Sequence, residues 1–229
     1  MKLLSLAPIC AGALTCGLLA QGAPPPTYMV PAIREPHHDV KLDNHYVRVL
    51  DVTVPPYDST LFHIHENPYV YVSIGPATLK AQVAGSNDFT DLILKDGEVR
   101  YSAAVTHRVG NIAATPFRNI TIQIQGRDDT PAKQPESPAR GASVVLDNDL
   151  VRVQRVVLDP GQSTGAHTHA RSHLLVAVHD GSLQIEADAH PTTRVTLASG
   201  DFDWHAGPWS HTLTNVGTTR FEAIEVAWK

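Results

Sequence analysis

The chain has 229 residues, with 18 Lys and Arg against 23 Asp and Glu, and a formal net charge of −5. This mild acidic excess, without a run of basic residues, argues against nucleic acid and against an anionic membrane surface as partners. Because 42% of the residues are hydrophobic and only 18% are charged, a folded globular protein is expected rather than a disordered one. The 17 Pro and 15 Gly favour a turn-rich all-β fold. The 13 His exceed what a chain of this length usually carries.

Residues 1–23 predict a secretory signal peptide. Lys2 is the only charged residue in this segment, and an apolar run at residues 3–20 is followed by small residues. We therefore expect the protein to be exported, to the periplasm or the extracellular space, with no other membrane segment. A spanning helix and a lipid anchor at Cys16 are the alternatives. Both cysteines, Cys10 and Cys16, lie in this segment, so its removal leaves neither a thiol nor a disulfide.

A repeat with a spacing of 104 residues divides the rest of the chain into two copies of one unit. Within residues 42–65, 12 of the 24 residues are identical to the residue 104 positions later. A unit of this size needs its own hydrophobic core. The expected organisation is an extended leader at 24–39, a first domain at 40–124, a polar and Pro-rich linker at 125–143, and a second domain at 144–229.

Within each unit, the hydrophobic pattern predicts short strands. Residues 46–52 and 151–156 alternate with period two, and the closing segments 119–124 and 220–226 also have a strand pattern. No segment after residue 30 shows a helical face. Many short strands separated by turn residues are typical of a sandwich or a barrel.

The histidines of the second unit have the spacing of a metal site. His167 and His169 are separated by one residue, so on a strand both side chains share a face, with Cα atoms about 6.6 Å apart. His173 follows four residues later, and His211 comes from a separate strand. Four converging imidazoles form a complete ligand set for a transition metal.

The first unit repeats this pattern with one change. His63, His65 and His107 correspond to three of the four histidines, and Tyr69 stands where the fourth would be. Tyr69 is therefore a candidate fourth ligand or pocket residue. The candidates for a substrate pocket in the second unit are Trp204, His205 and Trp209. The histidines expected at the surface or in loops are His37, His38, His45 and His190.

The sequence around these histidines resembles the cupin family, and specifically the bicupins, which carry two cupin domains in tandem. Cupin motif one is G-x5-H-x-H, followed by x3–4-E and then a Gly. The second unit is similar to it at Gly161, His167, His169, His173 (in the Glu position) and Gly181. Motif two, P-x-G-x2-H-x3-N, is similar to the segment that contains His211 and Asn215. The first unit keeps His107 and Asn111, with Pro56 and Tyr57 where the Gly of motif one would be.

The resemblance covers residues 40–228 and implies two tandem jelly-roll β-barrels, each with an ion inside. The carboxylate of the motif is replaced by His173 in one copy and by Tyr69 in the other. All-imidazole sites occur in cupin dioxygenases, and loss of the carboxylate tilts the preference toward Fe, Cu, Ni or Zn.

Three functions remain open from the sequence. The first is a metal-dependent enzyme of the dioxygenase type acting on a small organic substrate. The second is a non-catalytic protein that binds or stores a metal or small ligand, and the third is a metal-dependent isomerase or lyase. No obvious general base accompanies the motif, and pairing into a homodimer is an expectation from the family alone.

Overall fold

The computed structural model describes residues 28–132, 134–188 and 190–229, so the expected signal peptide with its two cysteines lies outside the described residues. The regular secondary structure of this part of the chain is almost entirely β-strand. Its one helix is a three-residue 3-10 turn, η1 (Ala32–Arg34). No helix in these three ranges has the length and apolar character needed to cross a membrane.

The N-terminal unit consists of two sheets. Its strands are β1 (Met29–Pro31), β2 (His38–Asp43), β3 (Val47–Val54), β4 (Phe62–His65), β5 (Tyr69–Ile74), β6 (Ala77–Val83), β7 (Thr90–Leu94), β8 (Val99–Ser102), β9 (Val105–Asn111) and β10 (Phe117–Ile124). The order in sheet A is β1-β4-β9-β6-β7, and the order in sheet B is β2-β3-β10-β5-β8.

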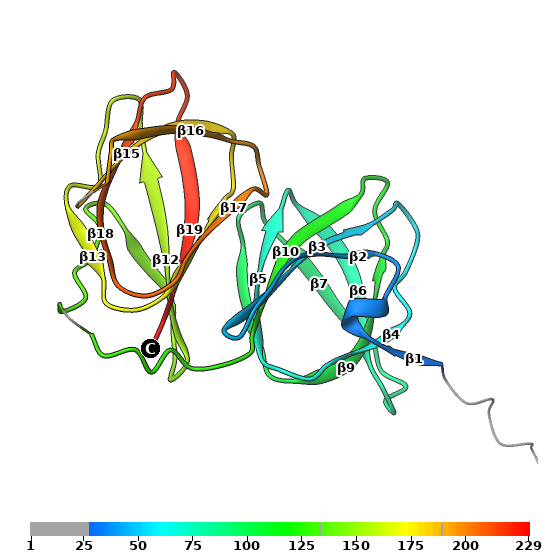
Figure 1. Ribbon diagram of the computed structural model, residues 1–229. Coiled ribbons are helices and arrows are strands. Elements are labelled where there is room, and N and C mark those ends of the chain that lie inside the picture. The colour runs from blue at the N-terminus through cyan, green and yellow to red at the C-terminus, as the bar shows by residue number, and fades with distance from the viewer. Residues whose placement is uncertain (1–27, 133, 189) are drawn as a thin grey trace, which may run out of the picture.

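The C-terminal unit repeats this arrangement (Figure 1). Its strands are β11 (Ser143–Asp147), β12 (Val151–Leu158), β13 (His167–His169), β14 (His173–Ala177), β15 (Gly181–Ala187), β16 (Thr193–Leu197), β17 (Phe202–His205), β18 (Trp209–Asn215) and β19 (Phe221–Trp228). Sheet C has the order β13-β18-β15-β16, and sheet D has the order β11-β12-β19-β14-β17. The strands of each unit thus pair into two sheets, which agrees with the all-β, two-domain organisation that was expected; the strand pairing of the described residues does not close either unit into a barrel.

The middle strands of sheets B and D are buried on both faces. In β3, Leu50, Val52 and Val54 point into the N-terminal unit, toward sheet A, while Val47 and Val49 point the other way. This alternation follows from the two-residue period of a strand. Because both faces of these middle strands are buried, their sequences are nearly continuous runs of apolar residues.

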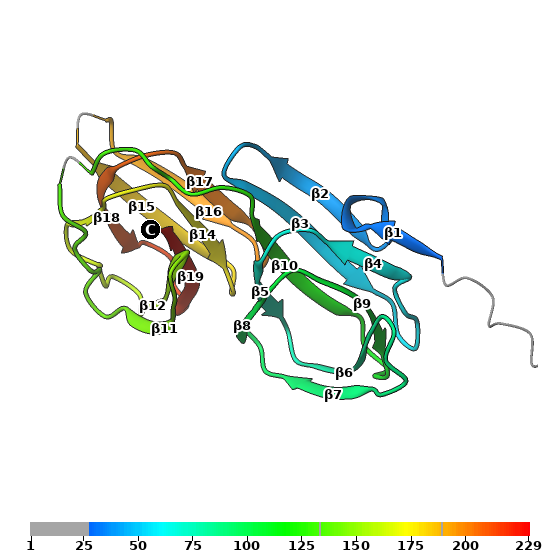
Figure 2. The same cartoon turned by 90° about the horizontal axis from the view of Figure 1, so that it is seen from below.

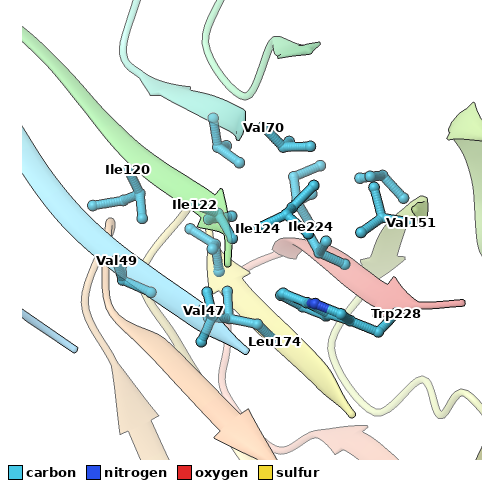
Figure 3. Close-up of a cluster of buried hydrophobic side chains, with 14 of the residues drawn as sticks. Val47, Val49, Val70, Ile120, Ile122, Ile124, Val151, Leu174, Ile224 and Trp228 are labelled. Carbon is cyan, nitrogen blue, oxygen red and sulfur yellow. The ribbon is translucent and has the colours of Figure 1, made fainter. Parts of the chain in front are cut away.

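Sheets B and D pack against each other through their outer faces, so the two units share a core. Figure 3 shows this cluster, to which β3, β5 and β10 contribute on one side and β12, β14 and β19 on the other. Its fully buried members include Val49, Ile122, Val153, Leu174 and Ile224. Figure 2 shows the two sheets side by side from below.

The leader and the linker are both ordered against the sandwiches. β1 pairs in parallel with β4, opposite His63, so this part of the leader is an edge strand of sheet A. In the linker, Ser137 forms an isolated β-bridge with Thr168 of β13. Each unit therefore has a preceding segment beside the strand that carries its H-x-H pair.

Candidate metal centres

Strand pairing brings the histidines of each unit together. His63 of β4 lies directly opposite His107 of β9, and His167 of β13 lies directly opposite His211 of β18. Opposed residues on neighbouring strands have Cβ atoms about 5 Å apart on the same face. The second histidine of each H-x-H pair shares that face, so three imidazoles meet inside each unit.

In the N-terminal unit, one ring nitrogen each from His63, His65 and His107 lies within 4.8 Å of the other two. His63 Nδ1 lies 2.9 Å from the Leu61 carbonyl oxygen, to which its N–H donates. This hydrogen bond leaves the lone pair on Nε2, the nitrogen available to a metal.

Gln123 of β10 has the same effect on His65. Its amide nitrogen lies 2.9 Å from His65 Nδ1, and its amide oxygen has no partner. With the amide turned over, this oxygen accepts the Nδ1–H, and His65 Nε2 keeps its lone pair. Gln123 was missed in the sequence because it lies far from the motif, on the last strand of the unit.

These imidazoles are neutral at physiological pH. Burial, and then the positive charge that neighbouring imidazoles would carry, lowers the pKa of His65 to about 2 and that of His107 to about 3. Burial also lowers the pKa of His63, although the Leu61 carbonyl acts in the opposite direction. A neutral imidazole is the form that binds a metal, so protons compete little at this site.

A cavity of about 260 Å³ extends from the three histidines between the sheets of the N-terminal unit. Tyr69 lines it and stacks on His65, with ring centroids 4.3 Å apart, and burial raises the pKa of this phenol to about 12. The other polar lining residues are His38, Thr60, Tyr71, Arg100, Tyr101, Ser102, Asn119 and Thr121, and the lining contains no carboxylate. The apolar end is formed by Val52, Val54, Leu79, Ala81, Leu92, Val109 and Phe117.

His38 was expected at the surface, but its side chain is only 3% exposed and faces this cavity. Its Nδ1–H donates to the Ala32 carbonyl at 2.8 Å, and its ring lies 4.6 Å from that of His63. The expectation failed because His38, which was assigned to the extended leader, is the first residue of β2, a strand of sheet B. By contrast, His45 and His190 are exposed, as expected.

In the C-terminal unit, the three histidines are joined by a carboxylate. His167, His169, His211 and Glu225 each offer one ligand atom, and these four atoms lie within 4.8 Å of one another. One oxygen of Glu225 lies 3.9 Å from Nε2 of His167 and 3.9 Å from Nε2 of His169. Glu225 comes from β19, so the expectation of a site without a carboxylate does not hold for this unit.

His173, expected as the fourth ligand, lies beside this group but outside it. Its ring stacks on His169, with centroids 3.8 Å apart, and on His205, at 5.1 Å. Burial and neighbouring imidazoles lower the pKa of His173 well below its usual value. The position that holds Glu in the cupin motif is therefore occupied by the stacked ring of His173. The carboxylate of the group is that of Glu225, on the neighbouring strand β19.

The three residues predicted to line a substrate pocket have different environments. Trp209 stacks on His205, with centroids 3.7 Å apart, and both line a cavity of about 20 Å³. Trp204 points to the other face of β17 and packs against Trp228 in the core between the units. The alternation of side chains along a strand accounts for this difference.

Comparison with known proteins supports the fold. No family model matches the sequence, and no curated protein matches it. Among solved structures, AerE from Microcystis aeruginosa has 10% identity and a TM-score of 0.59, over 85% of this chain and 98% of that one. Oxalate decarboxylase from Bacillus subtilis has 10% identity and a TM-score of 0.59, over 80% and 68%. A cupin domain from Bordetella pertussis has 25% identity and a TM-score of 0.37, over 42% and 99%.

The likeness to AerE and to oxalate decarboxylase, each at a TM-score of 0.59, shows that the chain has a cupin fold. Bacillus subtilis oxalate decarboxylase contains Mn(II) centres, a metal that was not among those expected from the sequence. The chain therefore combines a cupin fold with two histidine-rich groups that have the donors of a metal site.

Proposed function

We propose that the protein is a metal-dependent enzyme of the dioxygenase type, and that its reaction takes place in the N-terminal unit. The observation that carries this proposal is the cavity of about 260 Å³ into which His63, His65 and His107 face. Three protein ligands leave positions open on a metal, as catalytic sites require. A cavity of roughly 150 Å³ holds a benzene ring, so this one accommodates a somewhat larger organic molecule.

The donors fit a metal ion. Leu61 and Gln123 fix the orientation of His63 and His65, with Nε2 of each facing the interior, and the low pKa values keep the imidazoles unprotonated. When bound, such an ion acts as a Lewis acid that orients substrate oxygens and supports reaction with O2. Fe, Cu, Ni and Zn suit an imidazole set, and the Mn(II) of oxalate decarboxylase makes Mn the fifth metal to test.

The remaining lining residues bind and orient the substrate. Tyr69 stays a neutral phenol and can donate a hydrogen bond to a substrate oxygen. Thr121 donates to the Asn119 side-chain oxygen at 2.6 Å, which leaves the Asn119 amide nitrogen free to donate. The apolar end around Leu79 and Phe117 excludes water from the substrate body.

Dioxygenase chemistry is favoured over isomerase or lyase chemistry because the cavity lining lacks a carboxylate general base. Reaction of O2 with a chelated substrate does not require a general base, whereas moving a proton between carbons does. His38, the lining histidine outside the ligand set, is a weak base because burial lowers its pKa to about 4. The apolar end of the cavity also argues against simple storage of a metal, because its side chains add nothing to the affinity for an ion.

The test loads the chelator-treated protein separately with Fe(II), Cu(II), Ni(II), Zn(II) and Mn(II). Oxygen consumption is then measured with small chelating substrates such as diketones, catechols and 2-oxo acids. His107→Ala should abolish turnover, while the matched change His211→Ala should leave the chemistry of the N-terminal unit in place. Product formation without oxygen would instead support an isomerase or lyase, and binding without any product would support the non-catalytic alternative.

We also infer that the protein is exported. The inference rests on the composition of residues 1–23, where Lys2 precedes an apolar run that is followed by small residues. Mass spectrometry of the protein recovered from periplasmic or extracellular fractions should find a chain that begins near residue 24. A full-length chain retained in the cytoplasm would contradict it.

A further inference from the structure

The four donors of the C-terminal unit are buried and lack partners within the protein. His167, His169, His211 and Glu225 are each at most 4% exposed. The Nε2 atoms of the three histidines and both oxygens of Glu225 make no hydrogen bond in the described part of the chain. Buried polar groups are almost always satisfied, so several that face one another imply a bound partner.

Inside the unit, little room is left beside these donors for a substrate. The cavity of about 20 Å³ that His211 lines holds about one water molecule. A more open hollow of about 360 Å³, which His167 and His211 also line, is formed with the outward-facing Thr168 and Ser210. Trp209 and His205 fill the space inside the unit, because Trp209 lies opposite His169 and His205 lies opposite His173. In the N-terminal unit, the residues that occupy the same pairing positions are Val105, opposite His65, and Ser102, opposite Tyr69.

The four ligand atoms come from both sheets of the unit. His167, His169 and His211 belong to β13 and β18 of sheet C, whereas Glu225 belongs to β19 of sheet D. A single ion bound to all four would cross-link the two sheets through the interior. The N-terminal unit lacks this link because Thr121 stands 104 residues before Glu225.

We propose that His167, His169, His211 and Glu225 form a closed, four-coordinate site for a structural zinc ion that ties sheet C to sheet D. Three neutral imidazoles and one carboxylate are suitable zinc ligands, and a full set of four protein ligands characterises structural sites. The cation also compensates the buried Glu225 carboxylate. This role is separate from the proposed chemistry of the N-terminal unit and does not depend on it.

The competing arrangement is an ion pair without metal, in which His167 is protonated and faces Glu225. Burial lowers the pKa of His167, but the Glu225 carboxylate and the Gly165 carbonyl outweigh it and raise the pKa overall. An ion pair satisfies His167 and Glu225 but leaves Nε2 of His169 and of His211 without partners. A zinc ion would provide a partner for the ligand atoms of all four residues.

The test uses the full chain with the double substitution His63→Ala and His107→Ala, which leaves the C-terminal site as the candidate to be measured. After chelator treatment, we expect one equivalent of Zn2+ to bind and to raise the melting temperature. Co2+ as a probe should give the intense visible absorption of a four-coordinate site. Added azide should not change it, since no coordination position is open.

In this background, Glu225→Gln should weaken Zn2+ binding by at least about tenfold and abolish the rise in melting temperature. Thr121→Val, at the equivalent position of the N-terminal unit, is the matched control. It should change neither the affinity for Zn2+ nor the rise in melting temperature that Zn2+ causes. Absence of Zn2+ binding in the double variant, with an unchanged melting temperature, would overturn the proposal in favour of the ion pair. A Co2+ spectrum that responds to azide would also overturn it, because the site would then be open.

A second variant keeps the test decisive if Glu225→Gln does not fold. Trp209→Val gives the C-terminal unit the residue that the N-terminal unit has at the equivalent position, Val105, and it changes no proposed ligand. We expect it to keep one equivalent of Zn2+ and a Co2+ spectrum that ignores azide, because the four protein ligands fill the coordination positions whatever lies beside them. A spectrum that becomes sensitive to azide would overturn the proposal, because a coordination position would then be open and only covered by Trp209.

Discussion

At the scale of single residues, the internal repeat shows that the two sites differ mainly in which residues the last strand of each unit presents to the histidines. The inward-facing residues of β10 include Asn119, Thr121 and Gln123, and the residues 104 positions later on β19 are Ala223, Glu225 and Ala227. In the N-terminal unit these polar groups hold His65 and line a cavity. In the C-terminal unit a single carboxylate among small residues joins the histidines directly.

Three of the four histidines proposed for the second set lie together, because an H-x-H pair on a strand and a residue on its neighbour must share a face. Glu225 was not predicted because the family resemblance directs attention to the motif position, which His173 occupies. The segment after Phe221 does contain an indication of a site, since Glu225 is a charged residue in a mostly apolar strand. The sequence alone does not show that Glu225 lies on the inward face of β19, so it could not be recognised as a ligand.

The low pKa of His65 leads to a prediction for the metal-free protein. Below pH 6.5 the unfolded chain takes up a proton at this histidine, whereas the folded chain, in which the pKa is about 2, does not. The free energy of unfolding should therefore fall with decreasing pH, by about 2 kcal/mol between pH 7 and pH 5 from this residue alone. Replacing it (His65→Gln) removes this contribution, so the variant should show a correspondingly shallower pH dependence in urea denaturation.

The control for this prediction is His45→Gln, at an exposed histidine outside both groups. It should leave the pH dependence of the free energy of unfolding unchanged. Identical slopes for the parent protein and His65→Gln would contradict the argument, because they would mean that His65 is protonated in the folded state.

At the scale of elements, the segments outside the predicted domains behave as parts of the sandwiches. The sequence predicted an extended leader and a surface linker from their Pro content, but the pattern of three residues in β1 is too short to show a strand. The pairing of β1 with β4 is a tertiary contact that sequence periodicity does not report. The turn after β3 is left-handed in both units: Tyr57 has φ 59° where the second unit has Gly161 at φ 78°.

Asp128 fastens the linker to the start of β14. Its carboxylate accepts hydrogen bonds from the backbone N–H of Ser172 at 2.6 Å and of Thr130 at 3.0 Å. Burial raises the pKa of Asp128, but these hydrogen bonds outweigh it and lower the pKa to about 2. The stabilisation is therefore present above about pH 3.8 and is lost as the pH falls toward 2.

Replacing this carboxylate (Asp128→Asn) should lower the free energy of unfolding at pH 7 by about 2 kcal/mol, because only the charged form accepts both hydrogen bonds well. The difference from the parent protein should shrink as the pH approaches 2. Denaturation curves at pH 7, 4 and 2.5 measure it. The exposed neighbour provides the control, since Asp129→Asn should have little effect at any pH. A constant difference at all three pH values would contradict the assignment to the carboxylate.

At the scale of the whole molecule, the two units meet through matching faces with inverted charges. Asp51 pairs with Arg118 in the N-terminal unit, and the residues 104 positions later, Arg155 and Glu222, pair in the C-terminal unit. Each arginine also donates to a backbone carbonyl of the other unit: Arg118 to Ser199 at 2.8 Å and Arg155 to Gly97 at 2.6 Å. The turns at Gly97 and Gly200 need glycine, because φ is positive in both and a Cβ would meet the arginine within 3 Å.

This interface could not be predicted from the repeat alone. The repeat predicts two similar units, and the apolar runs of β10 and β19 predict buried strands, but neither indicates that their outer faces meet. The expectation of a homodimer stays a prediction. If the full chain dimerises, it must use another surface, because the apolar face of sheet B is already covered by sheet D.

The isolated N-terminal unit should therefore associate with itself. A chain of residues 24–126 would expose the outer face of sheet B, where Val49, Val72, Ile120 and Ile122 are at most 1% exposed in the full chain. An apolar face of this kind drives association, and a second copy offers a face of nearly the same shape as sheet D. Light scattering coupled to gel filtration should find a dimer or larger species. Placing a charge at the centre of the face (Ile122→Asp) should give a monomer. A parent fragment that is itself monomeric would contradict the prediction, because the exposed outer face of sheet B would then not drive association.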